Sequence, residues 1–175
     1  KKFAVWLEKN GYKTYDNNDI WSSSIGSKIK SLYLSKPKIG KPPLAFFHLL
    51  DVFIPSSRKI FYKKNIFSCA LAEIMMGYLN LSKIFSDIRL KTKAIDISNT
   101  LIKDALKTDN GIGWGLPYSW VTPKGIVQKK TPNIVQTSHC FNGFCKIYNE
   151  TKDEKYLFIL KNISDFVFDD LKIFY

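Results

Sequence analysis

Apolar residues recur every three or four positions through much of the chain. Residues 90–106, 134–149 and 154–171 each place such a series on one face, which is the pattern of an amphipathic helix. Residues 66–81 are apolar nearly all round, as expected of a helix buried on two sides. No segment alternates between apolar and polar residues as a half-buried strand does. The pattern therefore predicts an all-α protein.

The first third of the chain carries a weaker helical signal. Residues 2–9 predict a short helix, and residues 44–53 predict a second one. The rest of residues 25–64 is expected to be broken up, because proline has no N–H to donate within a helix. The four prolines concerned are Pro37, Pro42, Pro43 and Pro55.

Short links between the predicted helices indicate how they are joined. The polar link from Asn149 to Asp153 predicts that residues 134–171 form an antiparallel helical hairpin, and residues 66–106 are expected to form another. The length of 175 residues, with 45% hydrophobic residues, fits one folded domain over 1–175. No run is long enough to span a membrane. Three cysteines are too few for a disulfide framework, so a cytoplasmic setting is expected.

Positive charge is concentrated in the N-terminal third. Residues 1–66 hold 13 basic and 4 acidic residues, a net charge of +9, whereas residues 67–175 hold 14 and 11, a net charge of +3. Basic stretches attract anionic membrane surfaces, nucleic acid or acidic glycans, and they also occur simply as solvated surface. Nucleic acid is disfavoured, because no binding motif accompanies the lysines. With the apolar segment Leu44–Ile54, the charge predicts peripheral attachment to anionic lipid.

A loop rich in aromatic residues separates the predicted hairpins. Its residues Trp114, Tyr118 and Trp120 alternate with glycine and proline, which shape the backbone. Aromatic rings with polar edges suit the stacking of sugar rings, so these three residues and Tyr15 are candidate ligand-binding residues. We expect one tryptophan to anchor the loop in the core and the other, with Tyr118, to face a cleft shared with Tyr15 and Asp16.

Four residues are candidates for acid–base chemistry. Glycoside chemistry commonly uses two carboxylates, and Asp16 and Asp19 lie on one loop, where they could equally serve as turn or N-cap residues. Glu73 falls within the apolar segment 66–81, where burial would raise the pKa of its carboxyl, although it could instead be paired with a lysine. His139 could act as a base with a distant carboxylate, or be a core histidine.

The cysteines do not predict a metal site or a cofactor. Cys140 and Cys145 are five residues apart, about 140° around a helix, so they do not converge on one ion with His139. Small core residues are the better interpretation. No phosphate-binding loop, dinucleotide fingerprint or nucleophile elbow is present in the sequence.

Three stretches in order resemble a known family. Residues 11–19 are similar to a Y-D-x-x-D entry segment, residues 114–120 to a W-G-x-P-F-D-W loop, and residues 131–157 to a T-P-N…T-S…D-x-K-Y-L hairpin. These motifs resemble those of α/α-toroid proteins found with bacterial surface-polysaccharide genes, a group related to six-hairpin glycosidases and terpenoid-cyclase-like toroids. The resemblance departs at Ser119, where the family has Asp, and at His139, where a large apolar residue is common.

The resemblance implies a partial (α/α) toroid, with this chain as its N-terminal half. It implies a carbohydrate-active or carbohydrate-binding role in surface polysaccharide synthesis or modification, with a glycan or lipid-linked glycan as partner. Ser119 favours the alternative, a non-catalytic binding or assembly module of the same fold. Lanthionine cyclases, zinc enzymes that are also α/α toroids, are a third alternative. Because a half-toroid leaves apolar faces uncovered, self-association or docking onto a second half is expected.

Overall fold

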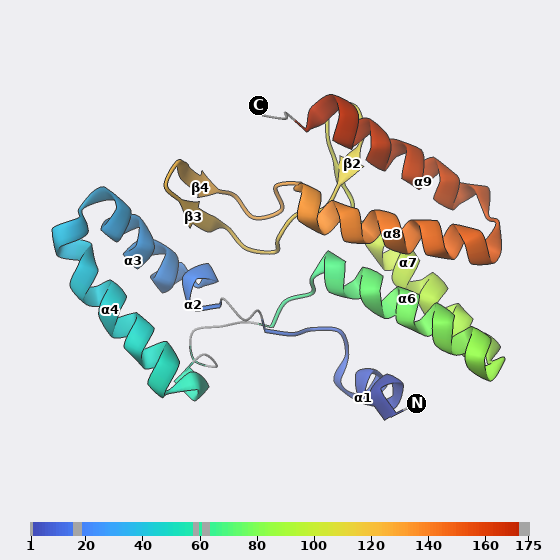
Figure 1. Ribbon diagram of the computed structural model, residues 1–175, viewed down its shortest axis with the longest axis horizontal. Coiled ribbons are helices and arrows are strands. Elements are labelled where there is room, and N and C mark those ends of the chain that lie inside the picture. The colour runs from blue at the N-terminus through green and yellow to red at the C-terminus, as the bar shows by residue number, and fades with distance from the viewer. Residues whose placement is uncertain (1, 16–18, 58–59, 61–63, 172–175) are drawn as a thin grey trace. The chain divides into compact units, whose positions relative to one another are not determined.

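The computed structural model describes residues 2–15, 19–57, 60 and 64–171 and is mostly helical, as predicted (Figure 1). The chain divides into two compact units. The first unit comprises Lys1–Tyr12, Ile66–Leu116 and Lys130–Tyr175, and the second comprises Lys13–Asn65 and Pro117–Lys129. The toroid, the hairpin arrangement and the single domain stay predictions.

The first unit is a set of packed helices. Helix α6 packs against both α7 and α8, and α8 packs against α9, as Figure 1 also shows. The five predicted helices of this unit are confirmed, with ends that differ by a few residues. Their bounds are α1 Lys2–Asn10, α6 Ser68–Phe85, α7 Ile88–Lys103, α8 Ile134–Thr151 and α9 Glu154–Asp165, followed by a π-helix, η2, at Phe166–Asp170.

Local sequence determines where these helices begin and end. Asp87, Asn133 and Asp153 precede α7, α8 and α9, and each side chain accepts a hydrogen bond from a backbone N–H of the first turn. Ser86 and Lys152 follow α6 and α8 in the left-handed conformation, with φ of 49° and 54°. These residues reverse the chain within the short links α6–α7 and α8–α9.

The core of the first unit lies between these helices. Its aromatic residues form a chain of contacts, with ring centroids 5.8 Å apart for Trp114 and Phe144 and 6.1 Å apart for Phe144 and Tyr156. The Tyr156 hydroxyl lies 2.8 Å from Ser98 Oγ on α7, so this buried polar atom has a hydrogen-bond partner. Aliphatic residues on all four long helices surround these rings; they include Leu71, Met75, Leu79, Ile97, Leu101, Ile147 and Ile163.

Short strands, which the sequence did not predict, lie in the connection between α7 and α8. Strands β1 Leu106–Lys107 and β2 Ile112–Gly113 form one antiparallel ribbon, and β3 Trp120–Thr122 and β4 Gly125–Val127 form another. The segment is non-helical, as predicted, but its strands were missed because strands of two or three residues are too short to show alternation. Gly111 is required before β2, since a Cβ there would lie 2.2 Å from the Asn162 carbonyl oxygen.

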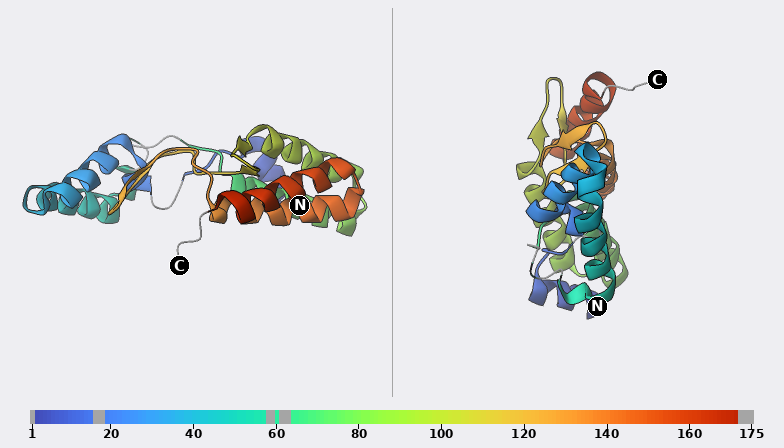
Figure 2. Two further views of the ribbon diagram at one scale, coloured as in Figure 1. Left: turned by 90° about the horizontal axis from the view of Figure 1, so that it is seen from above. Right: turned by 90° about the vertical axis from the view of Figure 1, so that its left-hand side faces the viewer.

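The second unit contains a helix pair, α3 Ser24–Ser35 and α4 Pro37–Phe53. These two helices pack against each other, and α3 also contacts β3 (Figure 2). Helix α2, Asp19–Ser22, precedes the pair, and a 3-10 turn, η1, follows it at Pro55–Ser57.

The expected break-up of residues 25–64 is wrong for this helix pair. Pro37 is the first residue of α4, where its missing N–H has no partner to lose, and the helix continues through Pro42 and Pro43. Close packing between α3 and α4 offsets the free energy that these prolines cost the helix. A Cβ at Gly40 would lie 2.3 Å from the Cα of Tyr33, so α3 and α4 approach to backbone contact.

Candidate functional site

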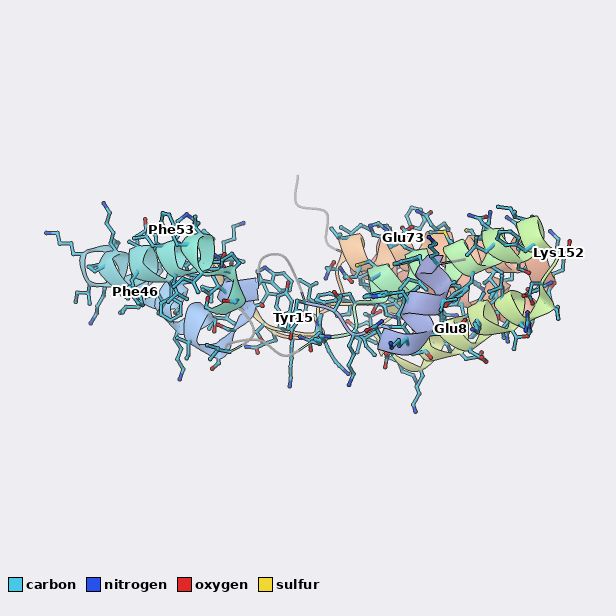
Figure 3. All side chains as sticks on the ribbon, turned by 90° about the horizontal axis from the view of Figure 1, so that it is seen from below. Glu8, Tyr15, Phe46, Phe53, Glu73 and Lys152 are labelled. Atoms are coloured by element: carbon cyan, nitrogen blue, oxygen red, sulfur yellow. The ribbon has the colours of Figure 1, made fainter. Side chains whose placement is uncertain are left out.

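Helix α4 exposes a continuous row of apolar side chains, which we call the α4 stripe. Its members follow the spacing of three and four residues that places side chains on one helix face. Phe46 and Phe53, labelled in Figure 3, are 60% and 76% exposed, and Leu49 between them is 53% exposed. The complete stripe is Ile39, Pro42, Phe46, Leu49 and Phe53.

The packing of α4 explains why this stripe is open. The helix turns its other face to α3, with Gly40 buried and Leu44, Phe47 and Leu50 half-buried. The described part of the second unit therefore uses one side of α4 for its own core. The α4 stripe is left as a row of large apolar side chains exposed to solvent.

Basic residues flank the α4 stripe. Lys38 and Lys41 lie on the next row around the helix and are exposed, and His48 follows on the same row. Asp51 is the one acidic residue of α3 and α4, and it is half-buried with its own interaction partner. The outer face of α4 is therefore both apolar and positively charged. The apolar segment Leu44–Ile54 and the basic character of the N-terminal third were predicted from the sequence, but the extension of the apolar row back to Ile39 was not.

None of the described helices is long and apolar enough to cross a membrane.

A second arrangement of interest pairs two residues that the sequence proposed separately. Glu73 on α6 and His139 on α8 meet across the two helices, with 2.8 Å between Oε1 and Nδ1. Their side chains are 55% and 42% exposed. The expectation of a buried Glu73 is wrong, because α6 turns Leu71, Ala72 and Met75 to the core and leaves position 73 at the surface. The pair therefore places a carboxylate and an imidazole side by side at the surface of the first unit.

Trp114 is a core residue and is not available to a ligand. It is 1% exposed, and its indole Nε1–H donates to the Leu101 carbonyl oxygen at 3.0 Å. Its backbone N–H donates to Thr137 Oγ1 at 3.0 Å. The expected ligand-binding role of Trp114 is therefore wrong, and this tryptophan is the anchor of its loop.

The other aromatic candidates belong to the second unit. Tyr118 and Trp120 are half-buried in and before β3, and Tyr15 is 38% exposed, with Lys64 Nζ 5.5 Å from the centre of its ring. Their ligand-binding role stays a prediction. Asp16 lies outside the described residues, and Asp19 begins α2 with a side chain that is likewise outside them.

Ser119, the residue that departs from the family motif, has a structural contact. Its Oγ accepts a hydrogen bond from the Lys129 N–H at 2.8 Å and so joins the segment that enters β3 to the segment that leaves β4. An aspartate could accept the same bond, so this contact does not by itself explain the departure.

The cysteines are free thiols. Cys140 is buried, and Cys69 and Cys145 are half-buried. Burial strongly raises the pKa of the Cys140 thiol and also raises that of Cys145, so neither is poised as a thiolate ligand or nucleophile. Among the described residues, no group of three metal-ligating side chains converges.

Comparison of the chain with protein-family models, curated proteins and solved structures found no match.

Proposed function

We propose that this chain is a peripheral membrane-binding protein that lays α4 on an anionic lipid surface. The observation that carries the proposal is the α4 stripe, a solvent-exposed apolar row flanked by lysines. Helices that lie in a membrane interface combine an apolar face with a basic polar face in this way.

The stripe is large enough to supply useful binding energy. Full burial of one Phe or Leu side chain contributes about 1.5–3 kcal/mol, so partial insertion of Phe46, Leu49 and Phe53 provides a few kcal/mol. Each lysine near an anionic surface adds about 1 kcal/mol. The 17 residues of α4 extend about 26 Å, enough for these groups to act on one surface together.

Charge favours lipid over a protein partner. An apolar row with spacings of three and four could also receive the helix of another protein. The lysines beside the stripe and the net charge of +9 over residues 1–66 match a surface of many anionic headgroups without demanding a specific acidic partner.

Vesicle co-sedimentation tests the proposal. The full chain is mixed with vesicles of phosphatidylglycerol and phosphatidylcholine, or of phosphatidylcholine alone, at low and at high salt. We expect binding to the anionic vesicles that falls as salt rises, because salt screens the lysine contribution. Absence of binding at low salt would refute the proposal.

Two pairs of variants separate the apolar and the basic contributions. Phe46→Asp should weaken vesicle binding at least tenfold, whereas Ile126→Asp, at an exposed apolar residue of β4, should leave it unchanged. Lys38→Glu with Lys41→Glu should weaken binding at least tenfold. The control Lys124→Glu with Lys129→Glu makes an equal change of charge beside the β3–β4 ribbon and should weaken vesicle binding much less.

A partner protein gives a different result. If the α4 stripe binds a second copy of this chain, Phe46→Asp will alter the oligomeric state measured by sedimentation and leave vesicle binding as it was. That outcome would replace the membrane proposal with an assembly role.

A further inference from the structure

The first unit contains an apolar groove between α1 and α6, which we call the α1–α6 groove. It has a volume of about 490 Å³, within the range of sites that hold small molecules. Its walls include Phe3, Ala4 and Leu7 of α1 and Ala70, Gly77 and Leu81 of α6. Along α6, the positions from 70 to 81 rise about 16 Å.

The middle of the groove is kept open by a glycine. Gly77 lies inside α6, and a Cβ at this position would meet no atom within 4 Å. Glycine inside a helix costs about 0.5–1 kcal/mol relative to alanine. No close packing in the described structure requires a glycine at this position, so the space beside Gly77 is available to a ligand.

Two polar groups border the apolar walls. The Tyr78 side chain is 2% exposed and lines the groove. Glu73 also lines the groove and is exposed to solvent. The described structure engages its Oε1 with His139, and the carboxylate has a second oxygen for another donor.

We infer that the α1–α6 groove binds an amphiphile with one unbranched alkyl chain and an ammonium head. The alkyl chain lies along the apolar lining of α6, from the head at Glu73 toward Leu81. The head lies at Glu73, because a carboxylate at the rim attracts a cation and repels an anionic head of equal size.

Calorimetric titration of the full chain tests this site with three probes below their micelle-forming concentrations. Dodecylamine supplies both the chain and the ammonium head, dodecanoate reverses the charge of the head, and butylamine shortens the chain. We expect dodecylamine to bind at least tenfold more tightly than either of the other probes. Because dodecanoate can also bind the basic α4 face, we assign to the groove only the binding that is lost when the Gly77→Leu variant fills the groove.

Gly77→Leu fills the groove, and Glu73→Gln removes its charge. We expect Gly77→Leu to keep the native circular dichroism spectrum and to lose dodecylamine binding. Undiminished binding by this folded variant would overturn the inference.

Glu73→Gln provides a test that does not depend on the folding of Gly77→Leu, because the residue is exposed. We expect this variant to bind dodecylamine and dodecanoate with similar affinity. An unchanged preference for the amine would overturn the assignment of the head to Glu73. Neither variant touches α4, so vesicle binding should persist in both, and failure of this site is distinguishable from failure of the membrane proposal.

Discussion

Replacement of Trp114 by Phe tests how much the buried hydrogen bond of its indole ring contributes to holding the aromatic loop. The indole Nε1–H donates to the carbonyl oxygen of Leu101, which lies in the last turn of α7. That carbonyl has no partner within its own helix, because the last four C=O groups of an α-helix are left free. Phe keeps an aromatic ring beside Phe144 but cannot donate a hydrogen bond.

The expected loss follows from the burial of both partners. Trp114 and Leu101 are 1% and 0% exposed, so the carbonyl cannot turn to water. A buried acceptor left without its donor costs about 1–3 kcal/mol, and the smaller ring forfeits roughly 1 kcal/mol of apolar burial. We therefore expect Trp114→Phe to lower the free energy of unfolding by about 2–4 kcal/mol, and Trp114→Ala to lower it by about 4–5 kcal/mol.

Urea unfolding followed by far-ultraviolet circular dichroism measures these losses. Trp6→Phe is the matched control, because Trp6 is 55% exposed on α1 and should change stability by less than about 0.5 kcal/mol. A Trp114→Phe loss no larger than that of the control would refute the reasoning. Trp114 would then not be the anchor of this loop.

Three further predictions concern other contacts of the first unit. Hydrogen bonds from the Thr108 hydroxyl and from Asn110 lower the pKa of Asp170. The stability that Asp170 contributes is therefore present above about pH 4 and is lost as the pH falls further. In thermal unfolding, the Asp170→Asn variant should lose less stability than the wild type between pH 6 and pH 3. Gly111→Ala should destabilise the protein by about 1–3 kcal/mol because its Cβ meets the Asn162 carbonyl, whereas Gly77→Ala should stabilise it by about 0.5–1 kcal/mol; equal effects in urea unfolding would contradict both assignments. Because burial raises the pKa of the Cys140 thiol, iodoacetamide should modify Cys140 only after denaturation, as mass spectrometry of tryptic peptides will show; rapid labelling of the native protein would contradict its burial.

The helices of the first unit could be predicted because their periodicity is strong and local. Each of α6, α7, α8 and α9 carries a long apolar series, and such a series specifies a buried face whatever the helix packs against. Helix α3 has a weaker series, with serines and lysines between its apolar residues. Its partner α4 begins with Pro37 and continues through two more prolines, and prolines inside a segment predict a break in the helix.

Contacts between distant residues could not be predicted from the sequence. Glu73 and His139 were proposed separately, but they are 66 positions apart, and periodicity does not say which helices pack together. The expected split between an anchoring and a ligand-facing tryptophan did not identify Trp114 as the anchor, because its partner carbonyl belongs to α7. The carbohydrate role of Tyr15, Tyr118 and Trp120 stays a prediction.

The chain itself offers a comparison that separates the α4 stripe from ordinary surface. Helix α7 also packs one face against its neighbours, and its outer face is mainly polar, with Arg89, Thr92, Asp96 and Thr100 exposed. A polar outer face keeps a solvated helix from attracting other surfaces. Helix α4 places large apolar residues in the corresponding positions, where they add nothing to the described core of its unit. Single exposed apolar residues are common, but a continuous row with lysines beside it is typical of a binding surface. The anionic membrane that we propose would cover both its apolar and its basic parts.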